Sequence, residues 1–201
     1  MTGYLIENGT VVDPLNKKVE KKDLLVVDGK FEDLDNPPPQ MEKISARGKY
    51  IIPGLFDLRC HLSQPGVSFQ KSVEKIGKKA AAGGFTSLLA MPELSSMADN
   101  PETLRFTQDS IINEDQVKVY LSGSLTMESA GTKLAPIGSL KETGIVAVTD
   151  CPKTPQDNQI FIKAVEYASM FNLPVIDMPR DLSLSPEGQV HESLLSLKMG
   201  L

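Results

Sequence analysis

From residue 51 onward, short apolar segments alternate with longer segments of helical periodicity, and this alternation limits the folds open to the chain. The short segments predict strands and the long ones helices, with strands at 55–60, 85–91, 117–121, 145–149 and 175–177 and helices at 69–82, 101–115, 137–142, 160–171 and 186–199. Strands that alternate with helices form parallel sheets, because a parallel connection needs a crossover. We therefore predict an α/β fold, either an open sheet or a barrel.

The first part of the chain follows another pattern. Residues that favour strands cluster at 3–13 and 23–31, around the turn dipeptides Asn8-Gly9 and Asp28-Gly29. These features predict hairpin-like antiparallel strands. The predicted domains are a small β domain at 1–52 and the α/β domain at 53–201.

Composition places the chain among soluble globular proteins, since 40% of its 201 residues are hydrophobic and 23% are charged. A formal net charge of −5 and a pI near 5.1 argue against a general nucleic-acid binder, which carries a basic face. The N-terminus lacks the basic segment and apolar core of a secretion signal, and no apolar run approaches the ~18 residues of a membrane span. Cys60 and Cys151 fit buried reduced thiols, so we expect a cytoplasmic protein.

The segment 53–66 has the spacing of a metal-binding motif in which one ligand is replaced. Asp57, Arg59 and His61 are two residues apart on a predicted strand, so we expect their side chains to share one face. A histidine at position 59 would complete Asp-x-His-x-His, in which two imidazoles converge on one metal ion. Arginine has no lone pair to offer a metal. Two interpretations remain: an altered metal site, or a single hydrogen-bonded histidine in a loop.

Five stretches together resemble the cyclic amidohydrolases, most closely the dihydroorotases. They are Tyr-Ile-Ile-Pro-Gly-Leu-Phe-Asp-Leu at 50–58, His-Leu-Ser-Gln-Pro-Gly at 61–66, Ala-Ala-Ala-Gly-Gly-Phe-Thr-Ser-Leu-Leu-Ala-Met-Pro at 80–92 with Asp-Asn-Pro-Glu-Thr-Leu at 99–104, Gly-Ser-Leu-Lys-Glu-Thr-Gly-Ile-Val-Ala-Val-Thr-Asp at 138–150, and Leu-Pro-Val-Ile-Asp at 173–177. Their order and spacing match the family over nearly the whole chain.

The resemblance implies a (β/α)8 TIM barrel of the metal-dependent hydrolase type, of which this chain holds about the first five βα units. It also implies that the N-terminal residues are part of a composite β-sandwich-like region. A barrel with only five of its strands leaves sheet edges open. We therefore expect that a longer polypeptide or a second chain completes the barrel.

The family binds zinc at the C-terminal ends of the barrel strands, and the resemblance carries its ligand positions over one by one. The two histidines after the first strand correspond to Arg59 and His61, so only the second is kept. The acidic ligand of the fourth strand corresponds to Asp150, and the histidine of the fifth strand to Met178, whose thioether is a poor zinc ligand. His61 and Asp150 are the residual metal ligands, and we expect no catalytic residue within this segment.

The substrate-binding positions of the family are altered too. The arginine that holds the substrate carboxylate corresponds to Ser63, and an asparagine corresponds to Glu93, whose negative charge opposes an anionic substrate. As a hypothesis, the Arg59 guanidinium forms an ion pair in the altered site with Asp57, Asp150 or Glu93. A buried charge needs such a partner.

These replacements predict a dihydroorotase-like protein of pyrimidine biosynthesis that is catalytically inactive and binds no cofactor. Its expected role is structural, as a homo-oligomer or in complex with another pathway enzyme such as aspartate transcarbamoylase. The alternative is an active zinc-dependent cyclic amidohydrolase of the dihydroorotase, hydantoinase or allantoinase type, with one metal ion held by His61, Asp150 and residues beyond 201. A third interpretation is a non-enzymatic relative that assembles cytoskeletal partners. None of these involves nucleic acid or a membrane.

Overall fold

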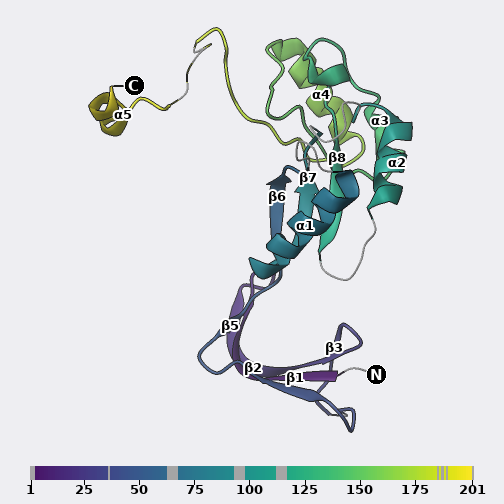
Figure 1. Ribbon diagram of the computed structural model, residues 1–201, viewed down its shortest axis with the longest axis vertical. Coiled ribbons are helices and arrows are strands. Elements are labelled where there is room, and N and C mark those ends of the chain that lie inside the picture. Colours follow the sequence, from purple (N-terminus) through teal and green to yellow (C-terminus); the bar gives the residue numbers. More distant parts are fainter. Residues whose placement is uncertain are drawn as a thin grey trace. The chain divides into compact units, whose positions relative to one another are not determined.

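The structure is a computed structural model that describes residues 3–35, 37–62, 68–92, 98–111, 117–184, 186, 188 and 190–200. Two units make up the chain, Met1–Gly54 and Leu55–Leu201 (Figure 1). Among the described residues, no helix is long and apolar enough to cross a membrane.

A mixed sheet forms the first unit. Its strands are β1 (Gly3–Asp13), β2 (Lys18–Val27), β3 (Lys30–Glu32), β4 (Glu42–Ser45) and β5 (Tyr50–Ile51). β1 pairs antiparallel with β2 and parallel with both β4 and β5, while β3 pairs antiparallel with β2. The antiparallel pairs agree with the predicted hairpins, and the two parallel pairs are additions that the sequence pattern does not indicate.

The two turn dipeptides of this unit have different roles. Asp28 and Gly29 have φ angles of 46° and 80° and form the predicted turn between β2 and β3. Asn8 and Gly9 lie inside β1, where a register shift against β2 marks a bulge, so the prediction of a turn there is wrong. An added Cβ atom at position 9 would lie 2.3 Å from Cδ1 of Ile51, so a larger residue there would displace the Ile51 side chain.

Parallel strands alternate with helices in the second unit. The strands are β6 (Leu55–Cys60), β7 (Phe85–Ala90), β8 (Lys118–Gly123) and β9 (Ala147–Val148), and the helices are α1 (Phe69–Ala82), α2 (Pro101–Ser110), α3 (Ile137–Glu142), α4 (Asn158–Ser169) and α5 (Leu194–Met199). The four strands lie in sequence order in one parallel sheet, as the alternation predicts. Figure 1 shows β6, β7 and β8 side by side. The fifth predicted strand is reduced to a parallel bridge between Val148 and Val175. The unit is therefore about half of an eight-stranded barrel.

Local capping explains where two of the helices begin. The Asn100 side chain accepts hydrogen bonds from the backbone N–H groups of Glu102 and Thr103, and Pro101 occupies the first turn of α2. Asp157 caps α4 in the same way. These caps satisfy N–H groups that the first helical turn leaves without an intrahelical partner.

The last helix is shorter than predicted. α5 begins after Ser193, which exchanges hydrogen bonds with Ser196 in a capping box, and it ends at Gly200, which has a φ of 73°. The described residues among 186–193 are not helical. The prediction that the helix starts at Pro186 is wrong, because the cap at Ser193 sets the first turn.

Buried side chains form two clusters on the second unit's sheet. Successive residues of a strand point to opposite faces, so Leu88 and Leu89 of β7 belong to different clusters. The helix-side core joins strand residues to helix residues, among them Leu88, Leu121, Leu104, Leu140 and Ala164. The inner cluster consists of Leu89, Met91, Ala147 and Cys151, with Tyr120, Val146, Ile176 and Met178 packed against it. Full burial of one such leucine stabilises the fold by about 1.5–3 kcal/mol.

β6 is more exposed than its apolar sequence predicts. Leu55, Phe56 and Leu58 keep 42%, 41% and 62% of their accessible surface. β6 is an edge strand that pairs with β7 alone within the described part of the chain. Phe56 is partly covered by Tyr120 of β8, with the ring centroids 5.5 Å apart. A short apolar run such as 55–58 is typical of a buried strand, and β6 departs from this because its second edge has no neighbour among the described residues.

Candidate functional site at the strand ends

The predicted metal positions follow strands that end at the same edge of the parallel sheet. Arg59 and His61 lie at the end of β6, Asp150 follows β9, and Met178 follows the bridge at Val175. Sites in parallel α/β folds form at the carboxyl ends of the strands. The topology therefore places these four positions at one edge.

Arg59 and Met178 contact each other although 119 positions separate them in the sequence. Nη1 of Arg59 donates to Sδ of Met178 at 3.6 Å, and the Arg59 backbone N–H donates to Oδ1 of Asp57 at 3.0 Å. A permanently charged guanidinium and a thioether are therefore in contact at two positions to which the resemblance assigns imidazoles. Neither group is suited to bind zinc.

Asp57 and Arg59 do not share a face of β6, contrary to expectation. The register between β6 and β7 shifts between Asp57 and Cys60, which breaks the alternation of side chains. Asp57 pairs with Leu88 of the helix-side core, whereas Arg59 reaches Met178 of the inner cluster. In place of the expected side-chain ion pair, Asp57 accepts the backbone N–H of Arg59. The ion pairs found among the described residues are Lys22–Glu20, Lys43–Glu7 and Lys78–Glu74.

The Asp150 carboxylate is buried, and the loop that follows β8 engages it. Asp150 is 3% exposed. Oδ1 accepts hydrogen bonds from the backbone N–H groups of Leu125 at 2.8 Å and Thr126 at 3.0 Å, and Oδ2 accepts one from the Thr126 hydroxyl. To bind a metal, the carboxylate would have to give up some of these bonds and leave buried donors unpaired. Asp150 therefore anchors this loop.

The structure describes the remaining predicted positions only in part. His61 is exposed at the end of β6. Ser63 and Glu93 lie outside the described residues. Cys60 belongs to the helix-side core, where burial, reinforced by the charge of Asp57, raises the pKa of its thiol above the ordinary value.

Zinc does not fit the residues that the structure describes. They contain no group of three or more His, Cys, Asp or Glu side chains that could hold a metal ion. A catalytic zinc site needs three protein ligands and a water molecule. Of the four carried-over positions, Arg59 has no lone pair, Met178 offers a thioether, and Asp150 is bonded to the loop.

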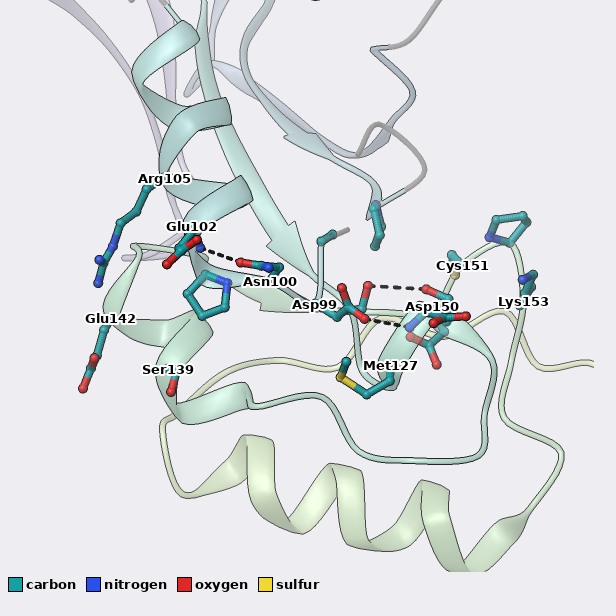
Figure 2. A pocket seen from close by; sticks show the side chains of 17 residues that line it. Asp99, Asn100, Glu102, Arg105, Met127, Ser139, Glu142, Asp150, Cys151 and Lys153 are labelled. Atoms are coloured by element: carbon teal, nitrogen blue, oxygen red, sulfur yellow. Dashed lines mark hydrogen bonds between the residues drawn. The ribbon is translucent and has the colours of Figure 1, made fainter. Parts of the chain in front are cut away.

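A cavity of about 1040 Å³ adjoins the strand ends. Its walls come from the start of α2, from α3, from the loop after β8 and from the residues after β9 (Figure 2). Arg105 and Glu142 lie at one end of the cavity, and Cys151 and Lys153 lie at the other (Figure 2). Asp150 lines it between α2 and Lys153, next to Asp99 (Figure 2).

Asp99 holds the loop that follows β8, a role that no pattern in the sequence indicates. Asp99 is 6% exposed, and its Oδ2 accepts a hydrogen bond from the Glu128 backbone N–H at 2.8 Å. Glu128 and Ser129 have φ angles of 56° and 48°, a left-handed conformation that costs roughly 1–3 kcal/mol for each such residue. Asp99 and Asp150 together hold this loop beside the cavity. The Asp-Asn-Pro run at 99–101 predicts a helix start and does not indicate this second role.

Known proteins of similar sequence include dihydroorotases. The family model described as dihydro-orotase-like matches residues 48–201. Curated dihydroorotases of Syntrophotalea carbinolica and Pelotomaculum thermopropionicum are 36% and 37% identical to this chain over 199 residues. These alignments cover 98% of this chain but only 47% and 46% of those proteins. The chain thus spans about half the length of the curated relatives that it matches.

Solved structures of similar fold include hydantoinases. L-Hydantoinase (dihydropyrimidinase) from Arthrobacter aurescens superimposes with a TM-score of 0.70 at 16% identity, over 89% of this chain and 41% of that one. D-Hydantoinase (dihydropyrimidinase) from Thermus sp. superimposes with a TM-score of 0.63 at 20% identity, over 98% of this chain and 43% of that one. These likenesses concern the fold. The fold is that of the amidohydrolase TIM barrels, and this chain forms about half of such a barrel.

Proposed function

Because this chain belongs to the dihydroorotase-like family, we propose that it is a dihydroorotase-like protein of pyrimidine biosynthesis that has lost metal-dependent hydrolysis and keeps a structural role. The contact between Arg59 and Met178 carries this proposal. Both are imidazole positions in the family resemblance. Here they hold a guanidinium and a thioether that contact each other.

A guanidinium at this position opposes a metal ion directly. Hydrolysis of a cyclic amide by this family needs a metal-bound hydroxide. A divalent ion beside the Arg59 guanidinium would be repelled by its positive charge, although solvent screens this repulsion because Arg59 is exposed. The loss of an imidazole ligand and the repulsion by the guanidinium both lower the affinity of the site for a metal ion.

The structural role that we propose is that of a homo-oligomer, or of a partner of another pyrimidine-pathway enzyme such as aspartate transcarbamoylase, in the cytoplasm. The exposed apolar side chains of β6 support it, because open apolar strand edges favour association. The free buried thiols of Cys60 and Cys151 suit a reducing compartment.

The second candidate is an active cyclic amidohydrolase with one zinc ion, held by His61, Asp150 and residues beyond 201. The dihydroorotase names of the curated relatives favour it. Against it stand the hydrogen bonds of Asp150, which the resemblance assigns as a second ligand.

Elemental analysis of the purified protein distinguishes the two candidates. We expect far less than stoichiometric zinc in the unmodified protein and no hydrolysis of dihydroorotate. The double variant Arg59→His, Met178→His is the matched control, because it replaces the guanidinium and the thioether by imidazoles, and we expect it to take up zinc. Stoichiometric zinc together with hydrolysis in the unmodified protein would establish the active candidate. A double variant that stays free of zinc would show that these two positions are not what excludes the metal.

The structural role has its own measurement. Light scattering of the purified chain, alone and mixed with aspartate transcarbamoylase, is expected to show a homo-oligomer or a complex. A monomer that forms no complex would contradict this part of the proposal and leave the metal content unaffected.

A further inference from the structure

A hollow of about 290 Å³ lies on the first unit, and none of the strand-end positions lines it. Asn8 and Thr10 line the hollow from β1, residues 21–23 line it from β2, and Arg47 and Gly48 line it from the turn between β4 and β5. β1 and β2 lie side by side in the sheet (Figure 1). All of these lining residues belong to the part of the chain that the structure describes.

Backbone hydrogen bonds hold the turn between β4 and β5 against β1. The Lys49 N–H donates to the Ala46 carbonyl at 2.9 Å, which closes the turn. On its two sides, the Ala46 N–H donates to the Glu7 carbonyl at 2.8 Å, and the Thr10 N–H donates to the Lys49 carbonyl at 3.0 Å. The position of Arg47 beside the hollow is therefore fixed by bonds between backbone groups.

Cations outnumber carboxylates in the lining of the hollow. Lys21, Lys22 and Arg47 contribute positive charges, and Asp23 contributes a negative charge. Glu20 pairs with Lys22 at 2.5 Å, whereas Lys21 and Arg47 take part in no ion pair found among the described residues. In a protein of net charge −5, this local excess of positive charge favours an anion at the hollow.

The acidic residue of the lining has a structural partner. Oδ1 of Asp23 accepts the Asn8 backbone N–H at 2.7 Å, a bond that ties the bulge of β1 to β2. The charge of Asp23 offsets one of the lining cations. Residues 1, 2 and 36, which lie outside the described part of this unit, are Met, Thr and Asn, so none of them adds an acidic side chain. The lining therefore keeps a net positive charge.

The size of the hollow and its donors restrict the ligand. A volume of 290 Å³ equals that of roughly ten water molecules, so a small molecule fits. The lining offers the planar donor fork of Arg47, the ammonium group of Lys21 and the hydroxyl of Thr10. A phosphate group accepts hydrogen bonds from all three kinds of donor and carries about 1.5 to 2 negative charges at pH 7. A carboxylate carries a single charge and matches the two cations less well.

We propose that the hollow on the first unit binds the phosphate group of a small molecule. The Arg47 guanidinium and the Lys21 ammonium group are its charged partners, and the Thr10 hydroxyl is a further donor. The inference goes beyond the proposed function and does not depend on it, because the site lies in the first unit and involves no metal position. Binding involves no covalent step.

Titration of the isotope-labelled full chain with glycerol 3-phosphate, followed by the NMR shifts of backbone amides, tests this proposal. We expect saturable shifts at residues 8–10, 21–23 and 47–48. Glycerol is the matched probe without charge and should cause none of them. Inorganic phosphate is titrated in parallel to identify the source of the group. Equal or tighter binding of inorganic phosphate would assign the free ion, tighter binding of glycerol 3-phosphate would assign an ester, and both results support the phosphate site.

Variants of the lining test which groups hold the phosphate. Arg47→Gln and Lys21→Gln each remove a cation, and each should weaken the binding of glycerol 3-phosphate about tenfold. Lys30→Gln removes an exposed lysine of β3 that does not line the hollow, and it should change the affinity by less than about twofold. Asp23→Asn keeps an oxygen for the Asn8 N–H and removes the opposing charge, so binding should become about threefold tighter.

Thermal unfolding establishes that each variant is folded before it is titrated, and Lys21→Gln serves if Arg47→Gln does not fold. Four outcomes would each overturn the proposal. They are the absence of saturable shifts with either phosphate, shifts of the same size with glycerol, shifts confined to the second unit, and equal affinity of the Arg47, Lys21 and Lys30 variants.

Discussion

Removal of the Asp150 carboxylate should destabilise the loop that follows β8. The substitution Asp150→Ala deletes the acceptor of three hydrogen bonds, donated by the N–H groups of Leu125 and Thr126 and by the Thr126 hydroxyl. Leu125 and Thr126 are 1% and 0% exposed. Because these donors are buried, water from the adjoining cavity can replace the carboxylate only in part.

The size of the effect follows from the donors that lose their partner. Each buried donor left unpaired costs about 1–3 kcal/mol. The Thr126 hydroxyl can rotate toward another acceptor, so the two backbone N–H groups dominate, and we expect a loss of roughly 3–5 kcal/mol. This is a large part of the ~5–15 kcal/mol that stabilises a typical domain.

Urea unfolding followed by circular dichroism measures this loss. Asp109→Ala, at an exposed position of α2, is the matched control, and we expect it to change the free energy of unfolding by less than about 0.5 kcal/mol. A chelator should leave the difference between Asp150→Ala and the unmodified protein unchanged, because the difference arises from hydrogen bonds. An Asp150→Ala variant as stable as the unmodified protein, or a difference that the chelator removes, would refute the anchoring role and return Asp150 to the metal ligands.

Two further predictions concern a thiol and two glycines. Cys60 should react with iodoacetamide only above the pH range of an ordinary thiol, because burial and the charge of Asp57 raise its pKa; reaction at the rate of a free thiol at neutral pH would contradict this. Below pH 9.0, the ordinary pKa of the thiol, the raised pKa of Cys60 costs the folded state nothing. As the pH rises through the raised pKa, the free energy of unfolding of the unmodified protein falls, because the unfolded chain releases the thiol proton more readily. Cys60→Ala should therefore lose less stability than the unmodified protein above pH 9.0. Gly77→Ala in α1 should stabilise the protein by about 0.5–1 kcal/mol, because nothing lies within 4 Å of the added Cβ atom. Gly84→Ala should destabilise the protein by about 1 kcal/mol, because Gly84 has a φ of 82°. Urea unfolding measures the free energy of unfolding of both glycine variants, and changes of the same sign would contradict these expectations.

Elements with short-range signals could be predicted from the sequence, and elements that depend on pairing could not. α1 and α3 have the predicted bounds, and α2 begins at the predicted Pro101 because the neighbouring Asn100 caps it. An apolar run shows where a strand can form, but its neighbours decide how much of it pairs. The run at 175–177 therefore contributes only the bridge at Val175.

The amino-acid sequence alone settles the order of strands and helices, the family resemblance and the absence of an imidazole at position 59, because each depends on residue identity or local pattern. Only the tertiary structure decides that Arg59 contacts Met178 and that Asp150 anchors the loop at Thr126, since 119 and 24 positions separate these partners. The register shift in β6 turns Arg59 away from Asp57 as well. Side-chain directions at the strand ends depend on such shifts and on contacts between distant segments, and no local pattern in the sequence encodes them.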